Sequence, residues 1–209
     1  MNSNKCKICR RVGQKLFLKG ERCASAKCAM IKRAFPPGPE KKRRPGAASG
    51  YKKALTEKQK LRRWYGLPEY QFKQYVVDIL EKRGKIQDIA DELIKRLEKR
   101  LDSVVFNLGL AKSRTNARQM VSHGYFLVNN KTVNIPSFKM KKGDLIAIRE
   151  GKKKKGAFKD IEVQLKKRTI PSWLEINKDT LIGKVKGEPS LAEVMPPAEI
   201  SIIFEFYSR

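Results

Sequence analysis

Apolar residues recur at three- and four-residue spacing from residue 51 onward, which is the pattern of amphipathic helices. A first helix is expected over residues 51–66, where Gly66 ends the pattern. A second is expected between Pro68, a favoured first residue of a helix, and Gly84. The apolar positions of the second helix and of the stretch after it are Phe72, Tyr75, Val76, Ile79 and Leu80, then Ile86, Ile89, Leu93, Leu97 and Leu101. A break between helices is expected near residues 100–102.

The elements become shorter after this break. Two short helices are expected over residues 101–108 and 113–123. A hairpin follows them, with its turn at Asn129–Asn130, because asparagine tolerates the positive φ that tight turns need. A second turn at Gly143–Asp144 leads into a strand over residues 145–148.

Two later segments favour strands. Residues 158–165, FKDIEVQL, alternate between apolar and polar side chains, and residues 199–209, EISIIFEFYSR, are rich in strong β-forming residues. The predicted fold class is α+β, with a helical N-terminal part followed by a small module of two helices and an antiparallel sheet.

The net charge of the chain limits the classes of partner that it is expected to bind. The chain has 209 residues, 48 Lys and Arg against 21 Asp and Glu, and a net charge of +27. Self-repulsion of this size favours a polyanionic partner, and nucleic acid is the first candidate because its phosphates bind many cations at once. A membrane partner is not expected, since no apolar run approaches about 20 residues. No apolar signal core follows the first residues, so we expect a cytoplasmic protein with reduced thiols.

All four cysteines lie in the first 35 residues. Two residues separate Cys6 from Cys9, thirteen separate Cys9 from Cys23, and four separate Cys23 from Cys28. Two close pairs joined by a loop suit tetrahedral zinc, since each pair brings two sulfurs to about 2.3 Å from one ion. An iron–sulfur cluster and four separate thiols are the alternatives. We expect a structural zinc ion, because a segment with so few apolar residues needs a metal to hold its fold.

The segment SRTNARQMVSHG concentrates hydrogen-bonding side chains at the corner between a helix and the hairpin. With Ser113 as the N-cap, Ala117, Met120 and Val121 fall on one face of the helix. The opposite face carries Arg114, Thr115, Arg118, Gln119 and Ser122. Arg114 and Arg118 are four residues apart, so we expect them to project side by side toward phosphate. A solvated face is the alternative, and a catalytic role is not expected because His123 has no nucleophile or carboxylate partner in its pattern.

These residues carry a family resemblance. The stretch RLDSVVFNLGLAKSRTNARQMVSHGYFLVNNKTVNIPSFKMKKGDLI resembles the RNA-binding module named after ribosomal protein S-four of the small subunit. The segments CKICRR, KLFLKG, FPPG, EKQKLRRWYGL, PSWLEI and FEFYSR occur in the order typical of the bacterial family, so the similarity spans nearly the whole chain. The four cysteines resemble those of its zinc-bearing form.

The resemblance implies a structural component of the small ribosomal subunit rather than an enzyme. Family proteins bind small-subunit ribosomal RNA at a helical junction in the 5′ domain and nucleate assembly. They also contribute to translational accuracy and to the channel through which messenger RNA enters. The implied partners are ribosomal RNA, neighbouring small-subunit ribosomal proteins and messenger RNA, with no membrane. The implied RNA-binding residues are Lys41, Lys42, Arg43, Arg44, Lys58, Lys60, Arg62, Arg63, Ser113, Arg114, Arg118, Gln119, His123 and Gly124.

The predicted organisation has four parts. They are a cysteine metal knuckle with a basic loop (1–45), a helical domain (46–100), the RNA-binding module (101–165) and a C-terminal extension that packs back on the other domains (166–209). The alternative classes are an RNA-modifying or tRNA-charging enzyme that carries the same module, and a zinc-dependent transcriptional regulator. The first needs a catalytic domain and the second a dimer seam or a groove-reading helix, and the sequence indicates none of these.

Overall fold

The computed structural model describes residues 5–39, 49–153, 156–158, 161, 165 and 168–208. Two compact units divide the chain. The first consists of Met1–Ala90 with Pro196–Arg209, and the second of Asp91–Met195. The finer four-part division remains a prediction. Among the described residues, every helix is too short or too polar to cross a membrane.

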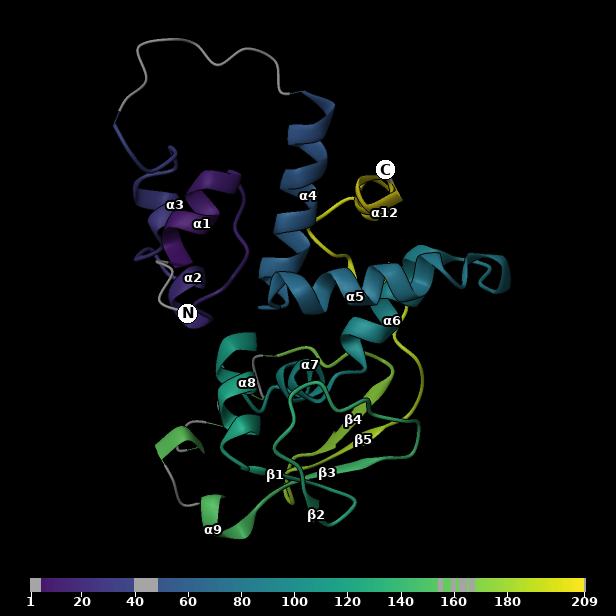
Figure 1. Ribbon diagram of the computed structural model, residues 1–209. Coiled ribbons are helices and arrows are strands. Elements are labelled where there is room, and N and C mark those ends of the chain that lie inside the picture. The colour runs from purple at the N-terminus through teal and green to yellow at the C-terminus, as the bar shows by residue number, and fades with distance from the viewer. Residues whose placement is uncertain are drawn as a thin grey trace. The chain divides into compact units, whose positions relative to one another are not determined.

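The first unit is helical, as predicted. Three short helices lie in the cysteine segment: α1 (Lys5–Val12), α2 (Glu21–Ala24) and α3 (Ala29–Lys32), which Cys28 precedes. The longer helices are α4 (Gly50–Trp64), α5 (Glu69–Leu80) and α12 (Ile200–Ser208), with a 3-10 turn, η1 (Arg83–Lys85), after α5 (Figure 1). Ser49 begins α4 by accepting a hydrogen bond from the Lys52 amide at 3.3 Å.

The C-terminal segment is a helix, so the expectation of a strand is wrong. In α12 the buried residues are Ile200, Ile203 and Phe204, whose spacing of three and four places them on one face. That face packs against α4 and α5, which bury Leu61, Phe72 and other apolar residues. Packing against an apolar helix surface therefore outweighs the β-propensity of these residues.

The strand expected over residues 158–165 is also wrong where the structure describes it. Phe158 ends a 3-10 helix, η2 (Gly156–Phe158), and Ile161 and Leu165 are helical. All three side chains are buried, and their spacing of three and four is that of a helix face. The remaining residues of the segment, 159, 160 and 162–164, lie outside the described residues.

The second unit joins helices to one antiparallel sheet. Its helices are α6 (Ile89–Glu98), which begins at the boundary, α7 (Leu101–Asn107), α8 (Arg114–Ser122), α9 (Glu150–Lys153) and α11 (Leu191–Val194). The break between α6 and α7 confirms the one predicted near residues 100–102. The strands are β1 (Phe126–Val128), β2 (Lys131–Thr132), β3 (Leu145–Ile148), β4 (Leu174–Asn177) and β5 (Ile182–Val185), in the order β2-β1-β3-β5-β4.

Local turn chemistry sets the first hairpin of the sheet. Asn129 and Asn130 both have positive φ, +48° and +65°, so the predicted hairpin turn is confirmed, and Val128 pairs with Lys131 across it. Elsewhere in the sheet, Phe126 pairs with Ile148, and Leu145 pairs with Lys184. The two strands β4 and β5 were not predicted, although they complete the sheet beside β3.

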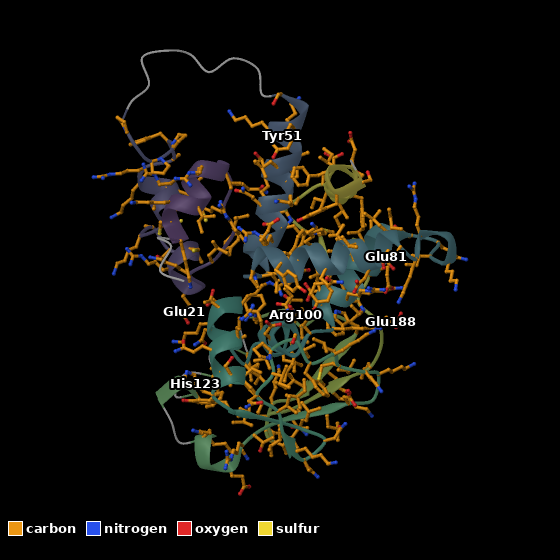
Figure 2. All side chains as sticks on the ribbon, in the orientation of Figure 1. Glu21, Tyr51, Glu81, Arg100, His123 and Glu188 are labelled. Carbon is orange, nitrogen blue, oxygen red and sulfur yellow. The ribbon has the colours of Figure 1, made fainter. Side chains whose placement is uncertain are left out.

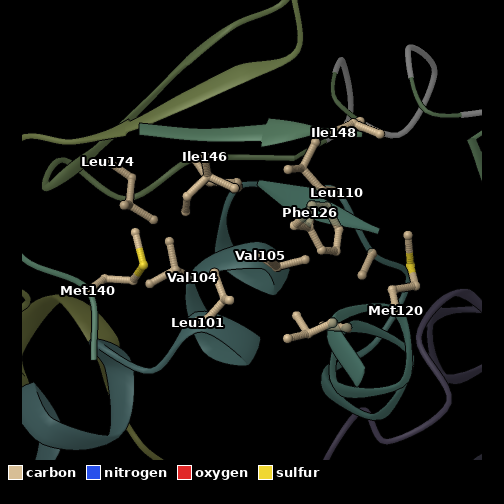
Figure 3. Packing of buried hydrophobic residues seen from close by; sticks show 14 of the residues in the cluster. Leu101, Val104, Val105, Leu110, Met120, Phe126, Met140, Ile146, Ile148 and Leu174 are labelled. Carbon is tan, nitrogen blue, oxygen red and sulfur yellow. The ribbon is translucent and has the colours of Figure 1, made fainter. Parts of the chain in front are cut away.

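The core of the second unit lies between α7, α8 and the sheet. Figure 1 shows both helices on one side of the strands, and Figure 3 shows the side chains of Leu101, Val104 and Val105 turned toward Phe126 and Ile146. All five of these side chains are fully buried. Helix α8 is therefore held on a rigid base, and its outer face is free to differ in chemistry from its inner face.

We expect Gly183→Ala to lower the free energy of unfolding by about 1–3 kcal/mol. Gly183 lies in β5 beneath the end of α7, where a Cβ would come within 2.5 Å of Cδ1 of the fully buried Leu108. Denaturant unfolding measures the change. The matched control is Gly151→Ala in α9, where a Cβ meets no heavy atom within 4 Å. Equal effects of the two substitutions would contradict close packing between α7 and β5.

Candidate nucleic-acid interface

Helix α8 forms as the sequence predicts. Ser113 is its N-cap, and its hydroxyl accepts a hydrogen bond from the Asn116 amide at 3.2 Å. Ala117 and Val121 are fully buried on the inner face. Gly124 follows the helix with φ +64°, the left-handed conformation that glycine adopts without strain. Ser113 and Gly124 thus set the two ends of the helix.

The outer face of α8 carries the polar residues expected there, except Arg114. Gln119 and His123 are exposed, and Arg118 is partly buried. His123 lies at the edge of the second unit, where side chains extend away from the protein (Figure 2). These three side chains together offer guanidinium, amide and imidazole donors on one surface, which suits phosphate and ribose oxygens.

Arg114 points inward, so the expectation that it projects beside Arg118 is wrong. Its guanidinium donates to the Glu98 carboxylate at 2.9 Å and to the Ser103 hydroxyl at 3.2 Å. The Glu98 side chain is fully buried, and that of Arg114 is only 10% exposed. A buried carboxylate requires a charged partner, and this requirement outweighs the helical spacing that suggested two parallel side chains.

A second arginine lies beside this pair. The guanidinium of Arg168 is centred 3.9 Å from the Phe106 ring, and that of Arg114 is 4.8 Å from the same ring. Arg168 also donates to the backbone carbonyl of Ala111 at 3.0 Å. Burial, with a smaller contribution from the charge of Arg114, lowers the pKa of Arg168 to about 10. Arg168 remains a cation at neutral pH, so this part of the unit carries two guanidinium groups.

The residues that support α8 from inside, Glu98 and Arg168, were not predicted from the sequence. Glu98 follows the buried Ile94 by four residues and so falls on the apolar face of α6. A charged residue on an apolar stripe is the signal that could have identified it. Arg168 gives no such signal, because it is one cation in the basic run of KKR before Thr169.

Several cationic side chains of the basic helix α4 form ion pairs within the first unit. Lys58 is buried, and its ammonium lies 2.5 Å from a carboxylate oxygen of Glu69 and 4.8 Å from the Phe206 ring. Arg62 pairs with the other oxygen of Glu69 at 3.2 Å. Tyr207 of α12 donates to the same carboxylate at 2.9 Å. Lys58 and Arg62 therefore connect α4, α5 and α12.

The other two residues of α4 that were predicted to bind RNA, Lys60 and Arg63, have different charged neighbours. Lys60 pairs with Glu57 at 2.5 Å. The pKa of Arg63 is lowered by burial and then by the charges of Arg62 and Arg11, so positive charges gather around it. Residues 41–44, Lys41, Lys42, Arg43 and Arg44, lie outside the described residues.

The four cysteines come together around one small cavity. Cys6 and Cys9 lie on α1, Cys23 lies on α2, and Cys28 precedes α3. All four line a cavity of about 20 Å³. Cys9 receives a hydrogen bond from the Leu16 amide, and Cys23 receives one from the Lys19 amide at 3.4 Å. The short helices thus bring both cysteine pairs to the same place, as their spacing suggested.

The side chains of this cluster are four cysteines, the ligand type of tetrahedral thiolate metal sites. Across the described part of the chain, no group of three or more His, Cys, Asp and Glu side chains is arranged to hold a metal ion as it stands. Burial raises the pKa of Cys9, and the neighbouring sulfurs raise it further, while the Leu16 amide lowers it. The net shift favours the neutral thiol of Cys9, while the donor set of four cysteine sulfurs is the one that a thiolate-binding metal uses.

Comparisons with known proteins find one family over nearly the whole chain. Residues 1–99 match the family described as "Ribosomal protein S4/S9 N-terminal domain", and residues 99–146 match the "S4 domain". "Small ribosomal subunit protein uS4" of Caldicellulosiruptor saccharolyticus is 45% identical, over 98% of this chain and 96% of that protein. The protein of the same name from Halothermothrix orenii is 44% identical, again over 98% and 96% of the two chains.

A third relative, "Small ribosomal subunit protein uS4" of Geobacter sp. strain M21, is 42% identical over 98% of this chain. These names describe ribosomal proteins and not enzymes, which confirms the expectation that the chain is not an enzyme. Identity at this level over nearly the full length of both proteins also confirms the resemblance to the family of ribosomal protein S-four. The chain belongs to the uS4 family of ribosomal proteins.

Proposed function

We propose that this protein is a structural component of the small ribosomal subunit in the cytoplasm and binds small-subunit ribosomal RNA directly. The observation that carries the proposal is membership of the uS4 family over 98% of the chain. The net charge of +27 supports it, because RNA phosphates neutralise a surface that otherwise repels itself. Neighbouring ribosomal proteins are the other partners.

The outer face of α8 is the RNA-binding surface of the second unit. Double-stranded RNA offers mainly phosphates and 2′-hydroxyls, so it is bound by shape and by backbone contacts. Arg118, Gln119 and His123 supply donors for such contacts from a helix whose other face is buried. Arg114 is a positioning residue, because its guanidinium is bound to Glu98 and Ser103 inside the unit.

The resemblance supports a more specific role. The RNA target is a helical junction in the 5′ domain, and binding there nucleates assembly of the subunit. Residues 41–44, with their four consecutive cations, serve the channel through which messenger RNA enters and contribute to translational accuracy. A protein with two compact units suits a junction, because each unit can bind the backbone of a different RNA helix.

We expect the protein to bind a 5′-domain fragment of ribosomal RNA more tightly than an equal mass of transfer RNA at moderate salt. Arg118→Ala should weaken this binding and reduce the slope of log affinity against log salt by at most about 0.9, because one phosphate contact is lost. Filter binding across a salt series measures both quantities. Arg118→Lys is the control, since it keeps the charge and should keep the slope. Equal binding of the two RNAs by the unaltered protein would contradict the proposal.

The cysteine cluster supports a structural metal site. We propose that Cys6, Cys9, Cys23 and Cys28 hold one zinc ion, with an iron–sulfur cluster as the alternative. Four sulfurs around one cavity and amide hydrogen bonds to two of them support this proposal. When bound, zinc joins α1, α2 and α3, which bury few apolar side chains of their own. Its role is to stabilise the fold and not to react.

The purified protein should contain about one zinc ion per chain. Cys23→Ser should abolish this stoichiometry and lower the unfolding temperature, because one of the four proposed ligands is lost. Metal analysis and circular dichroism measure the two effects. Ser25→Ala is the control, since Ser25 is exposed, lies near Cys23 and is not a proposed ligand. Bound iron with visible absorbance would favour the cluster, and a chain free of metal would contradict both proposals.

A further inference from the structure

Phe17 is an aromatic side chain that the fold turns toward solvent. It lies in the loop between α1 and α2, inside the sequence Leu16-Phe17-Leu18. Leu16 is 1% exposed and Leu18 lines the cysteine cavity, whereas Phe17 is 55% exposed. The two leucines that flank it therefore face inward while the phenylalanine faces outward.

The backbone of Phe17 adopts an unusual conformation. Its φ is +50°, in the left-handed region that a bulky side chain rarely occupies. Strain of this kind persists only where the surroundings impose it, and it is concentrated at functional sites. Here the Leu16 amide donates a hydrogen bond to the Cys9 sulfur, and the Lys19 amide donates one to the Cys23 sulfur. The Gly20 amide donates to the carbonyl of Phe17 at 3.2 Å. The cysteine cluster thus holds the strained loop from both sides.

The surroundings of Phe17 are cationic. Lys15 and Lys19 lie two residues before and two residues after it in the loop, and Lys19 is exposed. An aromatic face beside cations is the arrangement by which proteins bind unpaired nucleotides, because the base stacks on the ring and the phosphate meets the charge. A protein partner that buried Phe17 would have to cover these lysines as well.

Two of the most exposed aromatic side chains in the described part of the chain lack this combination. Phe35 is 58% exposed, but the guanidinium of Arg10 covers its ring at 5.0 Å and also donates to its carbonyl at 2.9 Å. Tyr70 is 80% exposed on the regular helix α5, where the backbone is not strained. Phe17 is thus an open ring that the backbone is forced to present.

We propose that Phe17 is a stacking platform for an unpaired base of the bound ribosomal RNA, with Lys19 next to the phosphate of that nucleotide. The inference rests on the proposed RNA-binding function and adds a contact that duplex RNA cannot make. Bases inside a helix are already stacked, so only a nucleotide in a bulge, a loop or a junction can stack on the ring.

The test is Phe17→Gly. Glycine adopts positive φ without strain, so this substitution removes the ring and should leave the unfolding temperature unchanged or raised. Affinity for the 5′-domain fragment should fall about 5- to 150-fold, the loss typical of one stacked base. The slope of log affinity against log salt should stay the same, because no phosphate contact is removed. Phe17→Trp should retain the affinity, and Tyr70→Gln should leave it unaltered.

Each outcome separates this inference from the proposed function. If Phe17→Gly binds as tightly as the unaltered protein, and that protein still prefers ribosomal RNA, the inference fails and the proposed function stands. A loss of affinity with a smaller salt slope also overturns the inference, since it indicates a lost phosphate contact. Absence of any preference for ribosomal RNA in the unaltered protein overturns both.

Discussion

The buried carboxylate of Glu98 constrains the arrangement of the second unit. It is fully removed from water, and its two oxygens accept hydrogen bonds from Asn107 at 2.5 Å and from Arg114 at 2.9 Å. A desolvated charge is tolerated only with such partners, so the end of α6, α7 and α8 must come together around it. Ser103 adds a contact from α7 to the same guanidinium. One acidic side chain therefore fixes the position of α8, the helix whose outer face is proposed to bind RNA.

The buried carboxylate of Glu98 places two arginines of α8 in different surroundings. Arg114 is four residues before Arg118, yet its charge is compensated inside the unit while Arg118 lies on the outer face. Arg168 and the Phe106 ring pack beside the internal pair. The first unit shows the same principle, because Lys58 and Arg62 pair with Glu69 and connect helices instead of extending into solvent. In a chain this basic, some cations therefore hold the fold together.

Features set by local chemistry were predictable from the sequence. The N-cap at Ser113 and the left-handed turn at Asn129–Asn130 depend on one or two residues, and the sequence identifies both. Features set by distant partners were not. Residues 200–208 form a helix because α4 and α5 supply an apolar surface, and Arg114 turns inward because Glu98 lies sixteen residues earlier. The outward ring of Phe17 also depends on the fold, since its loop lies against the cysteine cluster, where the Lys19 amide donates to the Cys23 sulfur.

The most direct test of this account is a double-mutant cycle between Glu98→Gln and Arg114→Met, with the free energy of unfolding measured for all four proteins. Arg114→Met alone should cost about 3–5 kcal/mol, because it leaves a buried carboxylate without its cation. The double variant should lose less than the sum of the single losses, with a coupling of about 1–3 kcal/mol. Additive changes, with Arg114→Met altering only the salt dependence of RNA binding, would contradict the account and make Arg114 a phosphate-binding residue.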